Sequence, residues 1–433
     1  MTIRKTIAAG AVVLGLALAG CGAPASQPDA TGNPASGEEI TLRFSWWGND
    51  TRNAMTQEVI AAFEEANPGI KVQGEPGEFS GYWDRLATQV AANDAPDVIQ
   101  MDDKYIAEYG KRGALMDLET LDISTDDFLD GTVDLGRVDG TLYGLNAGVN
   151  TSVILANPAV LEAAGVEMPD DSTWTWDDLA EIAKQVTDNS PEGTYGMQNL
   201  AWIEPALKGY LRQQGADQYN AEGQMGFEPA QLAPFFEYTK AIQDSGAAPS
   251  AAETSEDMGK SLDQTMSATG KLGFFQYWSN QVTALERATG EDLVLLRPPS
   301  QTGSAADAGM WFKASMLWSV SSRTEHQEAA AKLVDFLANS EEAGKIMMTE
   351  RGISANQTVR DAIRADMNEV DVKVVEYMDK IQPDLGETPV YVPPGGGTFQ
   401  SVQQRMVHDL IFDRRDAAAA AQGLYDEVRS NLA

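Results

Sequence analysis

The sequence predicts an α/β protein with a parallel sheet, and three observations support this prediction. Hydrophobic residues alternate with polar ones over 40–46, the period of two that is typical of a strand. They recur at helical spacing over 55–63, and Asn67-Pro68-Gly69 ends that helix. A second strand (70–72), a second helix (83–90) and a third strand (96–101) follow. Strands separated by helices at this spacing indicate a parallel α/β layer.

The later elements follow from local signals. Residues 143–155 are predicted to be extended and to lead out of the first domain. Pro158 suits the first position of a helix. Thr175 with Asp178 three residues later predicts a capping box. The chain is then predicted to be largely helical to about residue 280, with a strand at 271–278 inside this region. After it come extended chain at 310–322, helical chain at 325–348 and two helices from Phe399.

The N-terminal segment predicts export. Arg4 and Lys5 precede an uncharged run over 7–20, which is too short to span a membrane because a spanning helix needs about 20 residues. A positive start, a short apolar run and small residues predict a signal peptide over 1–20. Leu18-Ala19-Gly20-Cys21 resembles the lipobox of bacterial lipoproteins, and this resemblance implies cleavage before Cys21 and lipidation of its thiol. The alternative is an ordinary secreted protein with an incidental cysteine.

Composition then indicates how the rest of the chain is organised. Residues 21–39 form a tether, since 22–39 are polar or small and predict a flexible segment. Without the 20 residues of the leader, 413 of the 433 residues remain, enough for two domains. No later stretch approaches 18 uninterrupted apolar residues. We therefore expect an extracytoplasmic body that is anchored to the cell membrane by lipid on Cys21.

Charge and residue counts exclude several classes of partner. The formal net charge is −34, and it becomes −36 when Arg4 and Lys5 leave with the signal peptide. This argues against nucleic acid, whose phosphates are bound by Lys and Arg. The single cysteine is already assigned, and His326 and His408 lie far apart, so no Cys/His metal site and no cofactor are expected. A calcium site built from oxygen ligands stays open, although no D-x-D-x-D-G loop is present.

Six stretches, in order, resemble the sugar-type extracellular solute-binding proteins, family 1, of bacterial ABC importers. They are LRFSWWGND, YWDRLATQVAANDAPDVIQMD, LYGLNAGVNTSVILANP, TWTWDDLAEIAKQV, GKLGFFQYW and EAAAKLVDFLANSEEAGKIM. The resemblance implies a two-lobed periplasmic-binding-protein-like fold. Its lobes are discontinuous in sequence and are joined by a three-crossing hinge. The implied crossings lie near 148–150, 311–313 and 352–355, which gives lobe one as 40–148 plus 312–353 and lobe two as 149–311 plus 354–433.

The same resemblance implies a function without catalysis. The chain is expected to capture a carbohydrate, in particular an oligosaccharide, and to deliver it to the transmembrane subunits of an ABC permease while remaining a monomer. The alternatives are a different solute (a polyol, a phosphodiester or a peptide), an adhesive or structural lipoprotein, and a surface glycosidase. A glycosidase needs two carboxylates that flank one bond. Asp102 and Asp103 are adjacent in sequence and diverge at a strand end.

Candidate ligand contacts follow from sugar chemistry. Sugars present apolar faces and rims of hydroxyls, so a site needs aromatic rings with carboxylates or amides, placed beyond the carboxyl ends of strands. Trp278 is the strongest candidate platform. The alternatives are a core position for Trp46, a helix cap for Asp102 and a backbone-bonding hinge amide for Asn150. The candidate set is Trp46, Trp47, Tyr82, Asp102, Asn150, Trp202, Trp278 and Trp311.

Overall fold

The computed structural model describes residues 39–48 and 50–432, and residues from Glu39 onward form one compact unit. The predicted signal peptide, Cys21 and the tether up to residue 38 lie outside the described residues. The first three strands are parallel, with β1 between β2 and β3. Their bounds, with the intervening helices, are β1 (Ile40–Trp47), α1 (Asp50–Ala66), β2 (Ile70–Gly77), α2 (Phe79–Ala91) and β3 (Val98–Met101). The predicted α/β layer is therefore confirmed.

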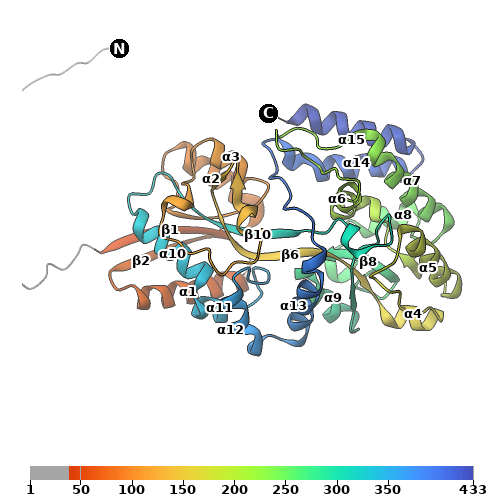
Figure 1. Ribbon diagram of the computed structural model, residues 1–433, viewed down its shortest axis with the longest axis horizontal. Helices are drawn as coiled ribbons and strands as arrows, with labels where there is room; N and C mark the ends of the chain where they lie inside the picture. The colour runs from red at the N-terminus through yellow and green to blue at the C-terminus, as the bar shows by residue number, and fades with distance from the viewer. Residues whose placement is uncertain (1–38, 49, 433) are drawn as a thin grey trace, which may run out of the picture. The chain divides into compact units, whose positions relative to one another are not determined.

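One sheet runs through the whole unit. Its strand order is β2-β1-β3-β10-β6-β8-β7, and β9 also pairs with β6. The long strands β6 and β10 are antiparallel to each other and join the two halves, as Figure 1 shows. The remaining strands are β4 (Arg137–Val138), β5 (Thr141–Leu142), β6 (Leu145–Ala156), β7 (Tyr195–Met197), β8 (Leu272–Trp278), β9 (Val294–Leu296) and β10 (Phe312–Val320).

Helices cover the sheet in each half, and each half has its own buried clusters. The half that contains β1 carries α3 (Ile106–Lys111), α10 (Gln327–Asn339) and α11 (Glu341–Met347). The helices that follow along the chain are α4 (Pro158–Ala164), α5 (Trp176–Asn189), α6 (Glu204–Arg212), α7 (Pro229–Ser245), α8 (Ala251–Asp257), α9 (Val282–Thr289), α12 (Gln357–Ile363), α13 (Glu369–Ile381), α14 (Phe399–Ile411) and α15 (Ala417–Asn431).

Local signals place most helix ends correctly. Thr175 and Asp178 form the predicted capping box, and Pro158 opens α4. The helical structure predicted over 325–348 is confirmed, and it consists of two helices, α10 and α11, that divide at Ser340. Ser340 is extended, and its hydroxyl accepts hydrogen bonds from the amides of the next helix. A serine hydroxyl that bonds to nearby backbone amides favours the start of a helix over the interior of one, so a new helix begins here.

The three segments predicted as hinge crossings lie side by side. Asn150 on β6 is the direct partner of Lys313 on β10. Val149 exchanges two backbone hydrogen bonds with Ile353, with N–O distances of 2.7 and 3.2 Å. The packing is tight, since a Cβ atom on Gly148 would lie 2.4 Å from the carbonyl oxygen of Arg351. Main-chain contacts therefore fix the crossings against one another.

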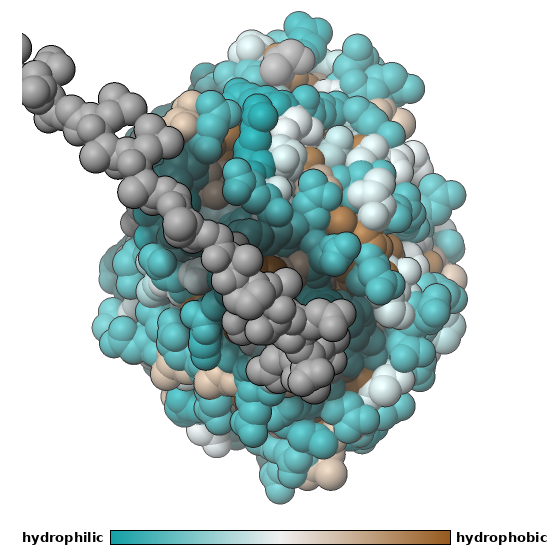
Figure 2. All heavy atoms as spheres, turned by 90° about the vertical axis from the view of Figure 1, so that its left-hand side faces the viewer, coloured by the Kyte–Doolittle hydropathy of each residue, from teal (hydrophilic) through white to brown (hydrophobic). Residues whose placement is uncertain are grey.

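The visible surface at one end of the molecule is largely hydrophilic. Figure 2 views the end of the molecule that carries β1 and β2, and hydrophilic residues predominate on this face. In the part of the chain that the structure describes, no helix has the length and hydrophobicity to cross a membrane.

Candidate ligand-binding site

A pocket with about 870 Å³ of empty volume lies beside the hinge, where the two halves meet. Its polar walls come from the residues after β3, from the end of β8, from the start of β10 and from α6, which agrees with ligand binding beyond strand ends. Irregular chain between α13 and α14 supplies another wall. The charged and aromatic residues of the lining include Asp103, Lys104, Glu204, Lys208, Trp278, Trp311, Lys313 and Tyr391.

Two predicted tryptophans line this pocket together. The rings of Trp278 and Trp311 meet edge to face, with centroids 6.2 Å apart. Trp311 is 6% exposed, and Lys208 Nζ lies 5.3 Å from its ring centroid. Trp278 keeps more of its surface accessible, and Lys313 Nζ lies 5.8 Å from its ring centroid. Cations over aromatic faces hold such rings in place. The Trp311 ring is thus buried and held in place, and the Trp278 ring is accessible to a ligand.

An ion pair stands next to the rings. Lys313 Nζ lies 3.2 Å from Asp103 Oδ2, and both side chains are about a quarter exposed, at 23% and 26%. Among the described residues, Asp103 Oδ1 accepts no hydrogen bond from a nitrogen or hydroxyl donor, although this atom is buried. A buried carboxylate oxygen without a donor is unfavourable until a partner arrives. Asp103, which lines the pocket, therefore has one oxygen, Oδ1, that can accept a further hydrogen bond.

Asp102, the neighbouring carboxylate that the sequence favoured as a ligand contact, lies in a different position from Asp103. Its Oδ1 accepts a hydrogen bond from the backbone amide of Lys104 at 3.0 Å, as in the cap that was the alternative. Burial, together with the negative charge of Asp103, raises the pKa of Asp102 to about 7. Burial acts in the same direction on Asp103, but the charge of Lys313 holds the pKa of Asp103 below its ordinary value. Asp103 therefore carries the charge of the pair, and Asp102 keeps its proton up to about pH 7.

Glu204 and Lys208 complete the wall on α6. Gln218 Nε2 donates to Glu204 Oε1 at 3.0 Å, and Lys208 Nζ lies 3.3 Å from Asp217. The sequence pattern did not predict these residues as contacts, because they lie on a helix face and not at a strand end. The Glu204-Pro205 start of α6 is visible in the sequence, but only packing shows that this helix lines the pocket.

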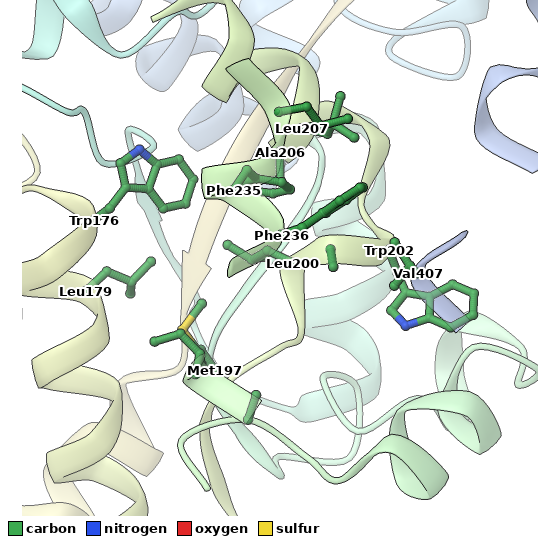
Figure 3. Packing of buried hydrophobic residues seen from close by; sticks show 14 of the residues in the cluster. Trp176, Leu179, Met197, Leu200, Trp202, Ala206, Leu207, Phe235, Phe236 and Val407 are labelled. Atoms are coloured by element: carbon green, nitrogen blue, oxygen red, sulfur yellow. The ribbon is translucent and has the colours of Figure 1, made fainter. Parts of the chain in front are cut away.

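Four predicted contacts lie in hydrophobic cores instead of the pocket lining. Trp46 is fully buried and Trp47 is 7% exposed, although both end β1. Tyr82 is 1% exposed, and its hydroxyl donates to the carbonyl oxygen of Gln100 at 2.7 Å. Trp202 is packed among apolar side chains of the largest core cluster, as Figure 3 shows. Their aromatic rings stabilise the fold through burial.

Asn150 lines a second pocket, with about 630 Å³ of empty volume. Its side chain is 6% exposed, and in the described residues its Oδ1 has no hydrogen-bond partner. Ser279, Asn280 and Asp371 are among the polar residues that surround the same space. The two pockets are neighbours, because Ser279 directly follows Trp278 and Asn150 pairs with Lys313.

A pocket between two halves that are joined by three adjacent crossings, with aromatic rings and unpartnered polar groups, defines a solute-binding protein. Residues 58–389 match the model of the family described as bacterial extracellular solute-binding protein, and the chain belongs to that family. The extracellular class of protein that the resemblance implied is thereby confirmed.

Known proteins of this class resemble the chain over most of its length. The maltooligosaccharide ABC transporter solute-binding lipoprotein of Streptococcus pneumoniae is 22% identical, and the match covers 99% of this chain and 97% of that protein. The arabinooligosaccharide-binding protein of Bacillus subtilis is 24% identical, with coverages of 79% and 77%. An uncharacterized lipoprotein of Streptomyces antibioticus is 30% identical, but the match spans only 46% of this chain and 42% of that relative.

A solved structure confirms the architecture. The extracellular solute-binding protein family 1 structure from Alicyclobacillus acidocaldarius superposes with a TM-score of 0.74 at 27% identity, covering 91% of this chain and 99% of that chain. The two-lobed fold predicted from the sequence is therefore correct.

Proposed function

We propose that this protein captures an oligosaccharide between its two lobes and delivers it to the membrane subunits of an ABC importer. The observation that carries the proposal is the pairing of an accessible tryptophan ring, Trp278, with the unpartnered acceptor Asp103 Oδ1 in one pocket. The ring suits the apolar face of a sugar, and the carboxylate oxygen accepts from its hydroxyls. The names of the pneumococcal and Bacillus relatives support the same ligand class.

The lobes are proposed with the boundaries inferred from the sequence, 40–148 plus 312–353 and 149–311 plus 354–433. The adjacency of Val149, Ala314 and Ile353 supports a hinge at these positions. A hinge of a few residues between two packed bodies permits closure around a ligand. We expect saturating ligand to reduce the radius of gyration in small-angle scattering, and an unchanged radius would contradict closure.

The ligand is proposed to extend into the neighbouring pocket. Asn150 has a buried amide oxygen without a donor, and a sugar hydroxyl would satisfy it. Trp278 lines the first pocket, and the next residue in the chain, Ser279, lines the second. This arrangement suits a ligand of more than one sugar unit.

The protein is proposed to act at the outer face of the membrane, as a monomer anchored by lipid on Cys21. The basis is the lipobox-like sequence, and lipoproteins among the relatives support it. Buried acyl chains hold a protein firmly when more than one is present. The family is a class of binding proteins, and we assign no catalytic role to the carboxylates.

The decisive experiment incubates the full chain in detergent with a panel of oligosaccharides, polyols, phosphodiesters and peptides. Binding raises the melting temperature, because a ligand that binds only the folded state stabilises it. A receptor returns the sugar unchanged and binds one mole per mole. Release of shorter sugars would indicate a glycosidase, and stabilisation by another solute class alone would overturn the carbohydrate assignment.

A further inference from the structure

Part of the pocket wall comes from a segment without regular structure. Residues 385–395, which we call the strap, connect α13 to α14, and residues 385–393 belong to no helix or strand. In Figure 1 this blue segment runs between the two halves of the molecule. The strap residues that line the pocket are Pro389, Val390, Tyr391 and Val392. A ligand in the pocket therefore contacts the strap.

Both ends of the strap are held by the half of the molecule from which it comes. The amide of Gly386 donates to the carbonyl oxygen of Met310 at 3.0 Å. Just beyond the strap, the hydroxyl of Tyr219 donates to the carbonyl oxygen of Gly396 at 2.7 Å. Prolines at 389, 393 and 394 restrict the backbone between these ends. The strap is thus tethered at its ends and stiff in its middle.

The middle of the strap is attached to the other half. The hydroxyl of Tyr391 accepts a hydrogen bond from Lys111 Nζ and donates one to Asp139 Oδ1, both at 2.8 Å. Lys111 Nζ also lies 3.1 Å from Asp139 Oδ2 and 4.8 Å from the centroid of the Tyr391 ring. Nearby, Thr388 Oγ1 donates to the carbonyl oxygen of Gly131 at 3.2 Å. Side chains alone make the Tyr391 attachment.

The partners of Tyr391 are well placed but exposed. Lys111 ends α3, the helix that follows the pocket residues Asp103 and Lys104. Asp139 lies in a two-residue hairpin turn with Gly140, where both residues have positive φ, as the turn that matches the strand twist requires. The side chains of Lys111 and Asp139 are 38% and 60% exposed. Solvent-exposed polar contacts of this kind are individually weak and break readily.

We propose that Tyr391 is the latch of a gate over the pocket and determines how long a sugar chain the protein accepts. The proposal rests on the proposed function for the identity of its ligand. With the latch formed, the strap is a wall, and a short ligand fits behind it. A longer chain fits only when the strap moves away, so it binds at the expense of the contacts to Lys111 and Asp139. The latch therefore favours short ligands over long ones.

The test is Tyr391→Phe, which keeps the ring against the pocket and removes the hydroxyl. The matched control is Tyr425→Phe, since Tyr425 also lies beside a cation, with Arg429 Cζ 5.3 Å from its ring centroid, and its site is on α15. Calorimetry on the full chain uses maltooligosaccharides and arabinooligosaccharides of two to five units. Affinity for the longest relative to the shortest binder should rise about fivefold, as expected from losing one or two exposed hydrogen bonds. A ratio within twofold of wild type, or an equal rise in the control, would overturn the proposal.

A second measurement needs no ligand. Hydrogen exchange at the amides of Glu387, Thr388 and Val390 should become faster in Tyr391→Phe and in Lys111→Met, and stay unchanged in Tyr425→Phe. Unchanged exchange in both latch variants would overturn the latch, whatever the sugar data. If the wild-type chain binds no sugar but exchange responds as expected, the proposed function fails and the latch stands.

Discussion

Asp103 and Lys313 form an ion pair, with 3.2 Å between Oδ2 and Nζ, that joins the segment just after β3 to the start of β10. The pair connects residues that are 210 positions apart in the sequence, and it stands beside the ring of Trp278. Asp103 is one of the residues that line the pocket. The pair thus joins two segments that line the pocket, and it leaves the second carboxylate oxygen of Asp103 without a nitrogen or hydroxyl donor among the described residues.

Asp103→Asn should lower both stability and affinity. The amide leaves the charge of Lys313 without its partner at a site that is only about a quarter exposed. We expect the free energy of unfolding to fall by about 1–2 kcal/mol, less than for a fully buried pair because water still reaches both groups. Denaturant titration measures the change.

The control for this variant is Glu427→Gln, which breaks the exposed pair between Arg405 and Glu427. That change should cost about 0.5 kcal/mol or less. The double variant Asp103→Asn with Lys313→Met should recover part of the lost stability, since it removes the unpaired charge. Equal losses for the exposed and the pocket pair would contradict the role assigned to Asp103.

Trp278→Ala should weaken sugar binding about 30-fold, because an aromatic anchor typically contributes ~2 kcal/mol and ~1.4 kcal/mol is tenfold. The melting temperature of the ligand-free protein should change little, since the ring is partly exposed. Trp46→Ala is the opposite case, a fully buried ring whose loss costs about 3–5 kcal/mol. Fluorescence titration and calorimetric melting on both variants separate the two roles. A large loss of stability with intact affinity in Trp278→Ala would move this residue from the site to the core.

Stability should depend on pH through Asp102. In the folded chain its pKa is raised to about 7, by burial and by the charge of Asp103, from an ordinary value of 3.8. Between these values the folded state binds more protons than the unfolded state, so this group's contribution to the free energy of unfolding falls as pH rises from about 4 to 7. Asp102→Asn removes that decline, and its amide oxygen still accepts from the amide of Lys104.

The measurement is the difference in melting temperature between Asp102→Asn and wild type. This difference should be more positive at pH 8 than at pH 5. Asp178→Asn serves as the control, because the hydroxyl of Thr175 lowers the pKa of Asp178 and its titration therefore lies below this range. A constant difference for Asp102→Asn across the range would show that this carboxyl titrates normally.

Cys21→Ala should release the protein from the membrane without altering the body from residue 40 onward. The expectation follows from the Leu18–Cys21 motif and from the polar segment after it. Metabolic labelling with a palmitate analogue measures attachment, and the melting temperature of the purified protein measures the fold. Label that persists in the variant would show that the lipid is attached at another residue and would overturn the assignment to Cys21.

Local sequence determined the elements and the class of fold. The alternation over 40–46 and the cap at Thr175 act within a few residues, so they could be interpreted without any distant contact. The ordered motifs predicted the positions of the three crossings, and the pairing of Val149 with Ile353 agrees with this prediction. Trp278 and Trp311 were found because a strand end and a crossing place them at the pocket.

Only the tertiary structure decided which aromatic rings are buried and which polar groups face the pocket. Trp46 and Trp47 point to opposite sides of β1, yet helices cover both, so alternation could not distinguish the core from the site. Lys208 on α6 and Tyr391 on the strap reach the pocket from segments far apart in the chain. Side-chain type and spacing indicate the local conformation of a chain. Burial, pKa and shared hydrogen bonds depend on neighbours that folding brings together, and these neighbours decided the site.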